Sequence, residues 1–315
     1  MTSPSPHIPV LMQQILEGFE PTSIKIMVDG TLGAGGHASA ILENHPEIEL
    51  FIGIDQDPEA LKIAEKNLEP WKSKVILKHG NFSQLDQILK ELSIKGVDGI
   101  LVDIGVSSMQ LDQASRGFSF MRNGPLDMRM NPENPLTAEI VINEWSEDQL
   151  GRIFREYGEE KKWRLAANAI IQARKNQRIQ TTTELVEVLK SALGQYSKKG
   201  FHPATLVFQA IRICVNKELE VLENFLPKAT DYLNKDGRLA VISFHRLEDR
   251  IVKSFTRQAA DDKWDTSGIG GLFQDKQPTV KLITKKPLEA SEEECRLNPR
   301  SRSAKLRIIQ KLENK

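Results

Sequence analysis

The sequence predicts an α/β fold in which a parallel sheet is interrupted by a long helical segment. Short apolar runs alternate with helical patterns over roughly the first hundred residues, and three of the first four runs end in an aspartate. These four expected strands are Ile24–Asp29, Leu50–Asp55, Val75–Lys78 and Val97–Asp103. Strands separated by helices predict βαβ units, whose parallel sheet places its ligand site at the carboxyl ends of the strands.

The helices between these strands follow from local signals. A helix is expected at 37–44, another begins near Pro58, which suits the first turn of a helix, and a third covers 82–92. A fifth strand is expected at Arg238–Phe244, followed by a helix near 247–259 and β segments near 280–284 and 304–309.

The alternation breaks between about residues 107 and 202, where no buried strand is evident. Helices are expected there near 137–143, 147–157, 161–176 and 183–193, and a long helix follows at 204–222. A structureless loop of that length would be implausible within a compact domain. We therefore predict an inserted helical domain for substrate recognition at 107–206, between two parts of one α/β domain at 1–106 and 207–315.

Composition excludes several classes of protein. The chain has 315 residues, with 43 Lys+Arg balancing 43 Asp+Glu, so net charge gives no sign of a nucleic-acid partner. Two distant cysteines, Cys214 and Cys295, indicate neither a disulfide framework nor a metal site. No export signal or apolar span is evident, which predicts a cytoplasmic protein without membrane contact. The oligomeric state, including a homodimer, stays open.

A glycine-rich loop follows the first expected strand. Gly30, Gly33, Gly35 and Gly36 let the backbone turn tightly, and Asp55, nineteen residues after Gly36, could accept both hydroxyls of a ribose. The register does not fit the dinucleotide motif Gly-x-Gly-x-x-Gly. The acid that precedes the loop disfavours a pyrophosphate and suits the sulfonium and ammonium groups of S-adenosylmethionine. The loop is similar to the first motif of class I methyltransferases.

Several long motifs extend this similarity over nearly the whole chain. They include HIPVL (7–11), DGTLGAGGHA (29–38), DIGVSSMQLD (103–112), HPATLVFQAIRICVN (202–216), DGRLAVISFHRLEDR (236–250) and NPRSRSAKLR (298–307). By these motifs the chain resembles the bacterial 16S rRNA (cytosine N4)-methyltransferases of the RsmH or MraW type. One departure is Arg246, where the family pattern has a serine.

The resemblance implies a class I, Rossmann-like S-adenosylmethionine-dependent methyltransferase fold with an inserted helical domain. It implies N4-methylation of a cytosine in the decoding centre of 16S rRNA, within the small subunit or an assembly intermediate. Phe82 follows the third strand, where it could cover an adenine. Carried onto this sequence, cofactor contacts fall on Gly35, Gly36, His37, Asp55, Phe82, Asp103 and Gln110.

The residues themselves favour methyl transfer to an amine. Methylation of cytosine at C5 needs a cysteine nucleophile, and neither cysteine lies in a suitable substrate loop. Direct displacement by an exocyclic amine needs only a held amine and hydrogen-bond acceptors. Asp103 is the candidate acceptor, and His245, at the end of the fifth strand, is a second catalytic candidate. We expect no metal.

Basic residues of the insertion are candidates for RNA binding, although a solvated helix face is the commoner explanation of such a run. The candidates are Lys161, Lys162, Arg164, Arg174, Arg178 and Arg212. Two other classes of function stay open from the residues alone: a dehydrogenase on a Rossmann-like sheet, and a nucleic-acid-binding regulator that retains a cofactor pocket. The glycine register argues against the first and the intact loop with its acids argues against the second.

Overall fold

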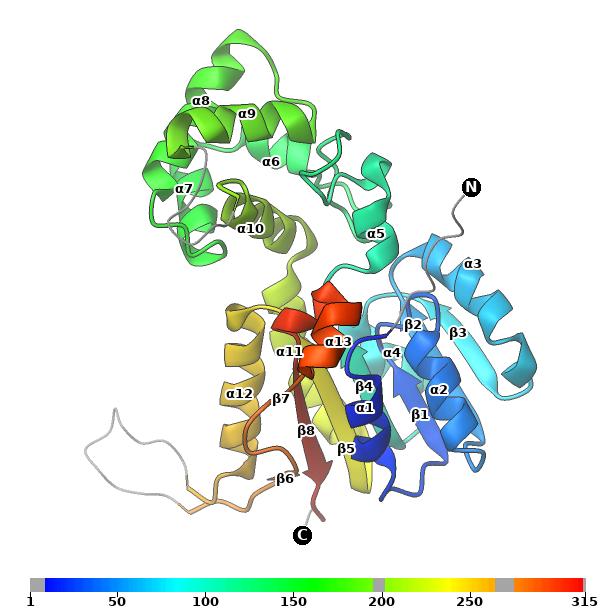
Figure 1. The fold of residues 1–315 in the computed structure, drawn as a ribbon. Coiled ribbons are helices and arrows are strands. Elements are labelled where there is room, and N and C mark those ends of the chain that lie inside the picture. Colours follow the sequence, from blue (N-terminus) through cyan, green and yellow to red (C-terminus); the bar gives the residue numbers. More distant parts are fainter. Residues whose placement is uncertain (1–8, 195–201, 264–274, 314–315) are drawn as a thin grey trace. The chain divides into compact units, whose positions relative to one another are not determined.

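The computed structural model describes residues 9–194, 202–263 and 275–313, and it divides into two compact units (Figure 1). The first unit comprises Met1–Gly105 and Leu219–Lys315, and the second comprises Val106–Glu218. The second boundary corrects the expected insertion of 107–206. It lies twelve residues later because helix α10 (Thr205–Asn216) packs on α6 (Ala138–Glu144) and α7 (Glu147–Glu156) of the second unit.

A mixed sheet forms the centre of the first unit. Its strand order is β3-β2-β1-β4-β5-β8-β6, with β7 paired to β8. The first five strands run parallel, and β8 runs antiparallel to its neighbours β5, β6 and β7. The strands are β1 (Ile26–Asp29), β2 (Leu50–Asp55), β3 (Val75–His79), β4 (Val97–Asp103), β5 (Leu233–Ser243), β6 (Val280–Leu282), β7 (Leu288–Glu289) and β8 (Lys305–Lys311).

The five parallel strands confirm the sequence prediction to within two residues at their ends, except at the start of β5. This strand begins at Leu233 rather than Arg238, because its pairing with β4 jumps from Val97↔Leu233 to Gly99↔Arg238. Residues 234–237 therefore lie in a bulge inside the strand.

Alternating side chains of the strands build two cores, one on each face of the sheet. Val28 and Ile100 belong to the core covered by α4 (Leu85–Glu91), α11 (Glu218–Tyr232) and α12 (Arg246–Ala260). Met27 and Leu101 belong to the opposite core, covered by α1 (Met12–Phe19), α2 (Gly36–Asn44) and α3 (Pro58–Asn67). A short helix α13 (Glu292–Leu297) precedes β8, and a 3₁₀ turn at Phe82–Gln84 precedes α4. Across the described segments, no helix has the length and apolar character needed to cross a bilayer.

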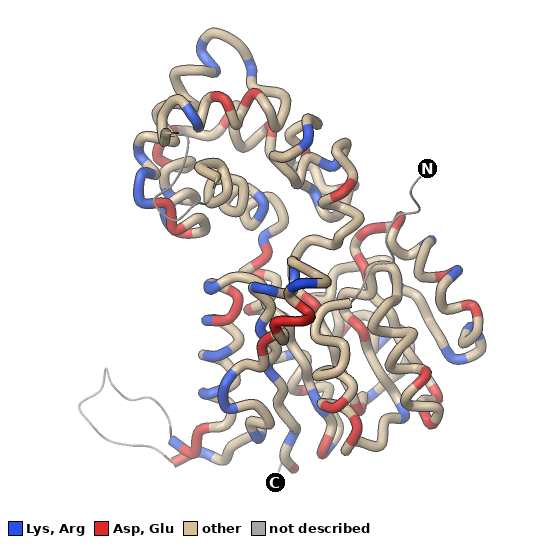
Figure 2. Tube along the Cα trace, viewed as in Figure 1, with Lys and Arg blue, Asp and Glu red and all other residues tan. Residues whose placement is uncertain are grey.

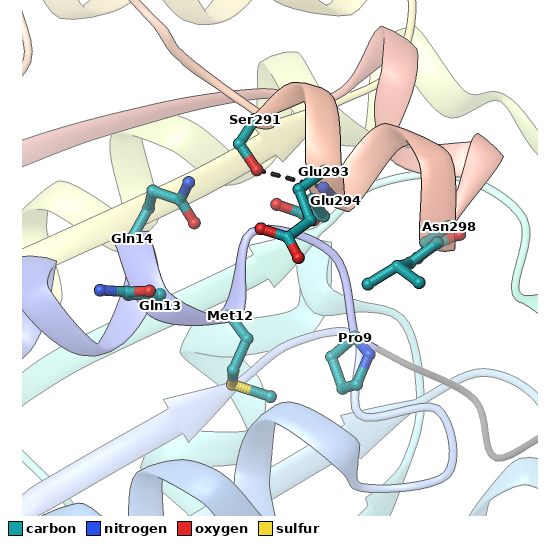
Figure 3. Close-up of a pocket in the computed structure, with 9 residues that line it drawn as sticks. Pro9, Met12, Gln13, Gln14, Ser291, Glu293, Glu294 and Asn298 are labelled. Carbon is teal, nitrogen blue, oxygen red and sulfur yellow. Dashed lines mark hydrogen bonds between the residues drawn. The ribbon is translucent and has the colours of Figure 1, made fainter.

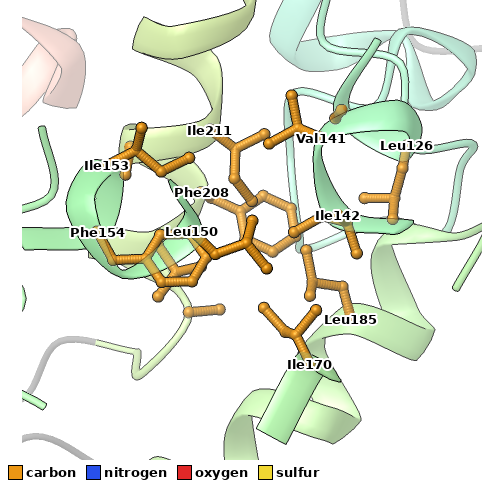
Figure 4. Packing of buried hydrophobic residues seen from close by; sticks show 14 of the residues in the cluster. Leu126, Val141, Ile142, Leu150, Ile153, Phe154, Ile170, Leu185, Phe208 and Ile211 are labelled. Atoms are coloured by element: carbon orange, nitrogen blue, oxygen red, sulfur yellow. The ribbon is translucent and has the colours of Figure 1, made fainter. Parts of the chain in front are cut away.

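The second unit is helical and has its own core. Leu150, Phe154, Ile170, Phe208 and Ile211 meet at its centre (Figure 4). Its remaining helices are α5 (Ser108–Asp112), α8 (Trp163–Asn176) and α9 (Thr182–Leu193). Because residues 106–218 contain their own contiguous hydrophobic core, the insertion is a structural unit in its own right.

The expected long helix at 204–222 is wrong, because the chain breaks at Lys217 into α10 and α11. Lys217 adopts a left-handed φ of 49°. The amide of the preceding, buried Asn216 donates to the Met128 carbonyl (2.8 Å) and accepts from the Met130 N–H (2.7 Å), and it also donates to the Arg212 carbonyl of α10 (2.9 Å). Tertiary hydrogen bonds of this kind override local helix propensity.

Gly30, directly after β1, should tolerate no side chain. A Cβ there would lie 2.8 Å from Val102 Cγ1 and 2.9 Å from Phe82 Cβ. A Cβ on Gly80, directly after β3, would meet the end of the Gln84 side chain at 3.1 Å and Ile88 Cδ1 at an ordinary contact distance of 3.7 Å. We expect Gly30→Ala to cost about 1–3 kcal/mol of unfolding free energy through overpacking. Gly80→Ala should cost much less, and equal shifts of the two urea midpoints would contradict the expectation.

Candidate active site

The site lies where the strand order of the sheet reverses. From β1 the chain proceeds outward through β2 to β3, and it then returns to place β4 on the other side of β1. Ligands of open α/β sheets bind at the carboxyl ends of the strands beside such a reversal. Here those ends carry Asp29 on β1, Asp103 on β4 and Asp55 on the adjacent β2.

The glycine loop is held against β2 by hydrogen bonds to Asp55. Gly33 and Gly35 adopt φ values of 54° and 82°, which glycine reaches without strain. The Gly33 N–H donates to Asp55 Oδ2 (2.7 Å), and the Asp57 N–H donates to Asp55 Oδ1 (2.8 Å). Each carboxylate oxygen keeps a further lone pair. Asp55 is therefore oriented and can still accept hydrogen bonds from a ligand.

Burial and mutual repulsion make the three carboxyl groups weak acids. Burial, joined by repulsion from Asp29 and then Glu248, raises the pKa of Asp103 to about 8. Burial raises the pKa of Asp29 to about 7, although hydrogen bonds from Thr31 oppose the shift. Burial also raises the pKa of Asp55 to about 6, against its backbone hydrogen bonds. These carboxyl groups disfavour one another's charge, so a bound cation would stabilise their ionised forms.

Two buried oxygens at the reversal point have no hydrogen-bond partner within the described residues: Asp29 Oδ2 and Asp103 Oδ1. The two strand ends are joined by Thr31, whose hydroxyl accepts from the Asp103 N–H (2.6 Å) and whose N–H donates to Asp29 Oδ1 (3.0 Å). Buried acceptors without partners are costly unless a ligand or cation satisfies them. The edge therefore fits a cationic ligand that carries hydroxyl groups.

Comparison with known proteins agrees with this geometry. The family model described as the MraW methylase family matches residues 4–312. The chain is 62% identical over 309 residues to the ribosomal RNA small subunit methyltransferase H of Protochlamydia amoebophila, covering 98% of each chain. It is 47% identical over 308 residues to the protein of the same name in Heliobacterium mobile, covering 97% of this chain and 99% of the relative. The chain belongs to the MraW methylase family.

Membership makes this protein a methyltransferase whose methyl donor is S-adenosylmethionine, and the residues present fit that donor. The acidic ends of β1 and β4 suit its sulfonium and ammonium groups, and Asp55 suits its ribose. When bound, the donor supplies an electrophilic methyl group on a cationic sulfur. A class I, Rossmann-like fold with an inserted helical unit is the architecture seen here.

Several residues expected from the MraW-type resemblance lie near this edge. Gly35 and Gly36 form the turn into α2, and the buried His37 follows them. The Cβ of Phe82 lies beside Gly30, and the Phe82 ring packs edge-to-face on Phe225 at 5.0 Å. Their contacts with the methyl donor stay predictions.

Two other candidates act as helix caps. His245 is the N-cap of α12: its Nδ1 accepts from the Glu248 N–H, while Glu248 Oε2 accepts from the His245 N–H. Gln110 belongs to the second unit, where it is buried and forms a capping box with Ser107 at the start of α5. Both side chains have a structural role as caps, and His245 Nε2 also lies 3.0 Å from Glu248 Oε1. The catalytic role of His245 and the cofactor contact of Gln110 stay predictions.

Four of the basic candidates for RNA binding are engaged within the second unit. Lys162 donates to the Leu193 carbonyl at the end of α9, and Arg174 donates to the Ile142 carbonyl in α6. Arg178 bonds Glu139 and Glu144, and Arg212 makes a two-pronged pair with Glu218. Lys161 and Arg164 are exposed, and among the described residues neither pairs with a carboxylate. The six candidates are therefore not equivalent.

Glu248 is an acid of the site that the sequence analysis misses. The sequence does give Asp29 a role beside the glycine loop, and the structure adds that its buried carboxyl group repels Asp103. Glu248 also repels Asp103, and its side chain accepts the Phe244 N–H at 2.8 Å. The spacing of His245 and Glu248 is that of a capping box, so the sequence could have predicted the cap. It could not have predicted that Glu248 lies close enough to Asp103 to repel it.

Replacing Asp103 should stabilise the ligand-free protein at high pH. Because the pKa values of Asp103 and Asp29 are raised, the folded protein holds protons that the unfolded chain releases above about pH 4, so stability falls as pH rises through 8. We expect Asp103→Asn to gain about 1–3 kcal/mol relative to wild type at pH 8 and much less at pH 5. Urea unfolding at both pH values measures this difference. Asp231→Asn, at an exposed position of α11, is the control, and a gain equal at both pH values would contradict the assignment.

Proposed function

We propose that the protein transfers a methyl group from S-adenosylmethionine to N4 of a cytosine in the decoding centre of 16S rRNA, within the small subunit or an assembly intermediate. The names of the relatives, which specify small-subunit ribosomal RNA, support the class of substrate. The resemblance of the motifs at 103–112 and 236–250 to cytosine N4-methyltransferases supports the base and the atom.

The position of Asp103 is the observation that favours an amine as the group that accepts the methyl. It ends β4 at the reversal point, and its buried Oδ1 accepts no hydrogen bond within the described part of the chain. An exocyclic amine can donate to such an oxygen, which holds the nitrogen in place and offsets the positive charge that develops as it attacks. A cytosine carbon offers no such donor. Asp103 is therefore suited to the N4 amino group.

The cysteines support the same choice. Cys214 lies on α10 in the core of the second unit, and burial raises the pKa of its thiol to about 11. A nucleophilic cysteine needs a lowered pKa and access to its substrate. Cys295 lies on α13, and its Sγ is 3.8 Å from Ser301 Oγ. Neither environment is that of the nucleophile required for C5 methylation.

The function can be tested on the product. Purified protein, S-adenosylmethionine and small subunits lacking the modification should yield N4-methylcytidine in 16S rRNA, measured by nucleoside mass spectrometry. Asp103→Asn should lower kcat at least about a hundredfold and donor affinity far less, because its role is strongest in the transition state. A Cys214→Ala/Cys295→Ala variant is the matched control and should stay active. A C5-methyl product, or a folded but inactive cysteine variant, would contradict the proposal.

For the RNA we propose a contact surface on α7 and α8 of the second unit. The Trp163 ring packs against Gly151, with the Arg164 guanidinium 4.1 Å and the Arg155 guanidinium 5.4 Å from its centre. Exposed Lys161 lies two residues before Trp163. Cations over an aromatic ring combine phosphate contacts with a platform for stacking bases. Lys and Arg as well as Asp and Glu are spread over the rest of this unit (Figure 2).

Charge removal at matched positions tests this surface. Lys161→Gln/Arg164→Gln should weaken RNA binding about tenfold and reduce the slope of log K against log salt by roughly 1–2, since each lost phosphate contact removes about 0.7–0.9. Arg178→Gln/Lys190→Gln removes the same charge from residues that already pair with glutamates in the second unit. Filter binding across a salt series should leave the control pair near wild type. Equal effects of the two pairs would show only a general charge effect.

A further inference from the structure

His37 has a fixed protonation pattern because of the backbone beside it. Its buried ring places Nε2 2.9 Å from the carbonyl oxygen of Val10. A carbonyl oxygen can only accept a hydrogen bond, so Nε2 carries the proton, and Nδ1 of the neutral ring presents a lone pair. Nδ1 lies 3.9 Å from Asp103 Oδ2. The imidazole can therefore accept a proton from Asp103, the residue proposed to accept a hydrogen bond from the amine.

The Val10 carbonyl is itself held in place. Pro9 packs against Gly36, where a Cβ would lie 2.7 Å from Pro9 Cγ, and the Leu11 N–H donates to Glu294 Oε1 at 2.7 Å. Pro9, Met12 and Glu294 line a pocket of about 330 Å³ between this segment and α13 (Figure 3). Contacts on both sides of Val10 restrict rotation of its carbonyl, and this restriction fixes the tautomer of His37.

Methylation of an amine requires a destination for one proton. The nitrogen lone pair forms a bond to the methyl carbon while the methyl–sulfur bond breaks and its electron pair stays on sulfur. The methylated nitrogen then carries a positive charge until it loses a proton. Asp103, as the hydrogen-bond acceptor of the amine, is the nearest acid–base group in the proposed mechanism.

We propose that His37 takes up this proton from Asp103, so that the pair ends the reaction as an imidazolium and a carboxylate. The inference rests on the proposed function. Asp103 faces Asp29 from β1 and Glu248 from α12, and Asp29 in turn faces Asp55 from β2. This negative surrounding favours a positive imidazolium. The 3.9 Å separation is longer than a hydrogen bond, and catalytic hydrogen bonds often tighten only in the reacting complex.

The opposing explanation is that His37 merely pins the segment at 9–11 to α2. Two substitutions separate the roles. Glutamine at position 37 retains an N–H for the Val10 carbonyl but has no basic nitrogen, whereas phenylalanine has neither. A pinning residue would be rescued by glutamine, and a proton acceptor would not.

We expect His37→Gln and His37→Phe each to lower kcat about ten- to a hundredfold. Donor affinity in His37→Gln should fall much less than kcat, and the acidic limb of its kcat–pH profile should shift by at least about half a pH unit. Wild-type rate and profile in His37→Gln, with loss only in His37→Phe, would overturn the inference, as would a loss confined to donor affinity. A wild-type protein that makes no N4-methylcytidine would instead overturn the proposed function.

A measurement on the ligand-free protein tests the inference without turnover. Histidine ¹⁵N spectra, with His37 assigned by its absence from His37→Gln, should show protonated Nε2 and unprotonated Nδ1 in the neutral ring. The opposite tautomer would remove the lone pair from Asp103 and overturn the inference.

Discussion

The repulsion among the carboxyl groups at the ends of β1, β2 and β4 is the constraint that connects this fold to its chemistry. Asp29 and Asp103 repel each other across the reversal point of the sheet, and each has a buried oxygen without a hydrogen-bond partner in the described chain. Folding alone gains little from such an arrangement, because buried like charges and unsatisfied acceptors are unfavourable. A bound cationic methyl donor would supply the missing charge. Such a site would be complementary to its ligand at the expense of the stability of the free protein.

The surrounding elements keep these acids in register. Thr31 connects the ends of β1 and β4, and Asp55 holds Gly33 in the loop that leads to α2. The N-terminal segment packs on the same loop through Pro9 and binds His37 through the Val10 carbonyl. Residues distant in sequence thus orient the carboxyl groups, so that substitutions outside the acids themselves should alter their protonation.

The features that the sequence predicted are those fixed by local patterns. Buried strands that end in Asp29, Asp55 and Asp103, and a glycine loop between them, follow from hydropathy and spacing alone. The break at Lys217 could not be predicted, because it depends on hydrogen bonds from Asn216 to a loop more than eighty residues away. Likewise, nothing in the composition distinguishes Arg174, which caps a helix, from the exposed Arg164. Tertiary partners decide which charges remain available.

Proton exchange on binding tests the central claim most directly. Calorimetry of S-adenosylmethionine binding to the ligand-free protein, repeated in buffers of different ionisation enthalpy, gives the number of protons released. Carboxyl groups with pKa values of about 7 and about 8 hold protons at neutral pH, and a bound cation should displace them. We predict net proton release near pH 7, with an affinity that rises between pH 6 and pH 8. Binding without proton exchange, at an affinity that does not change over this range, would contradict the account.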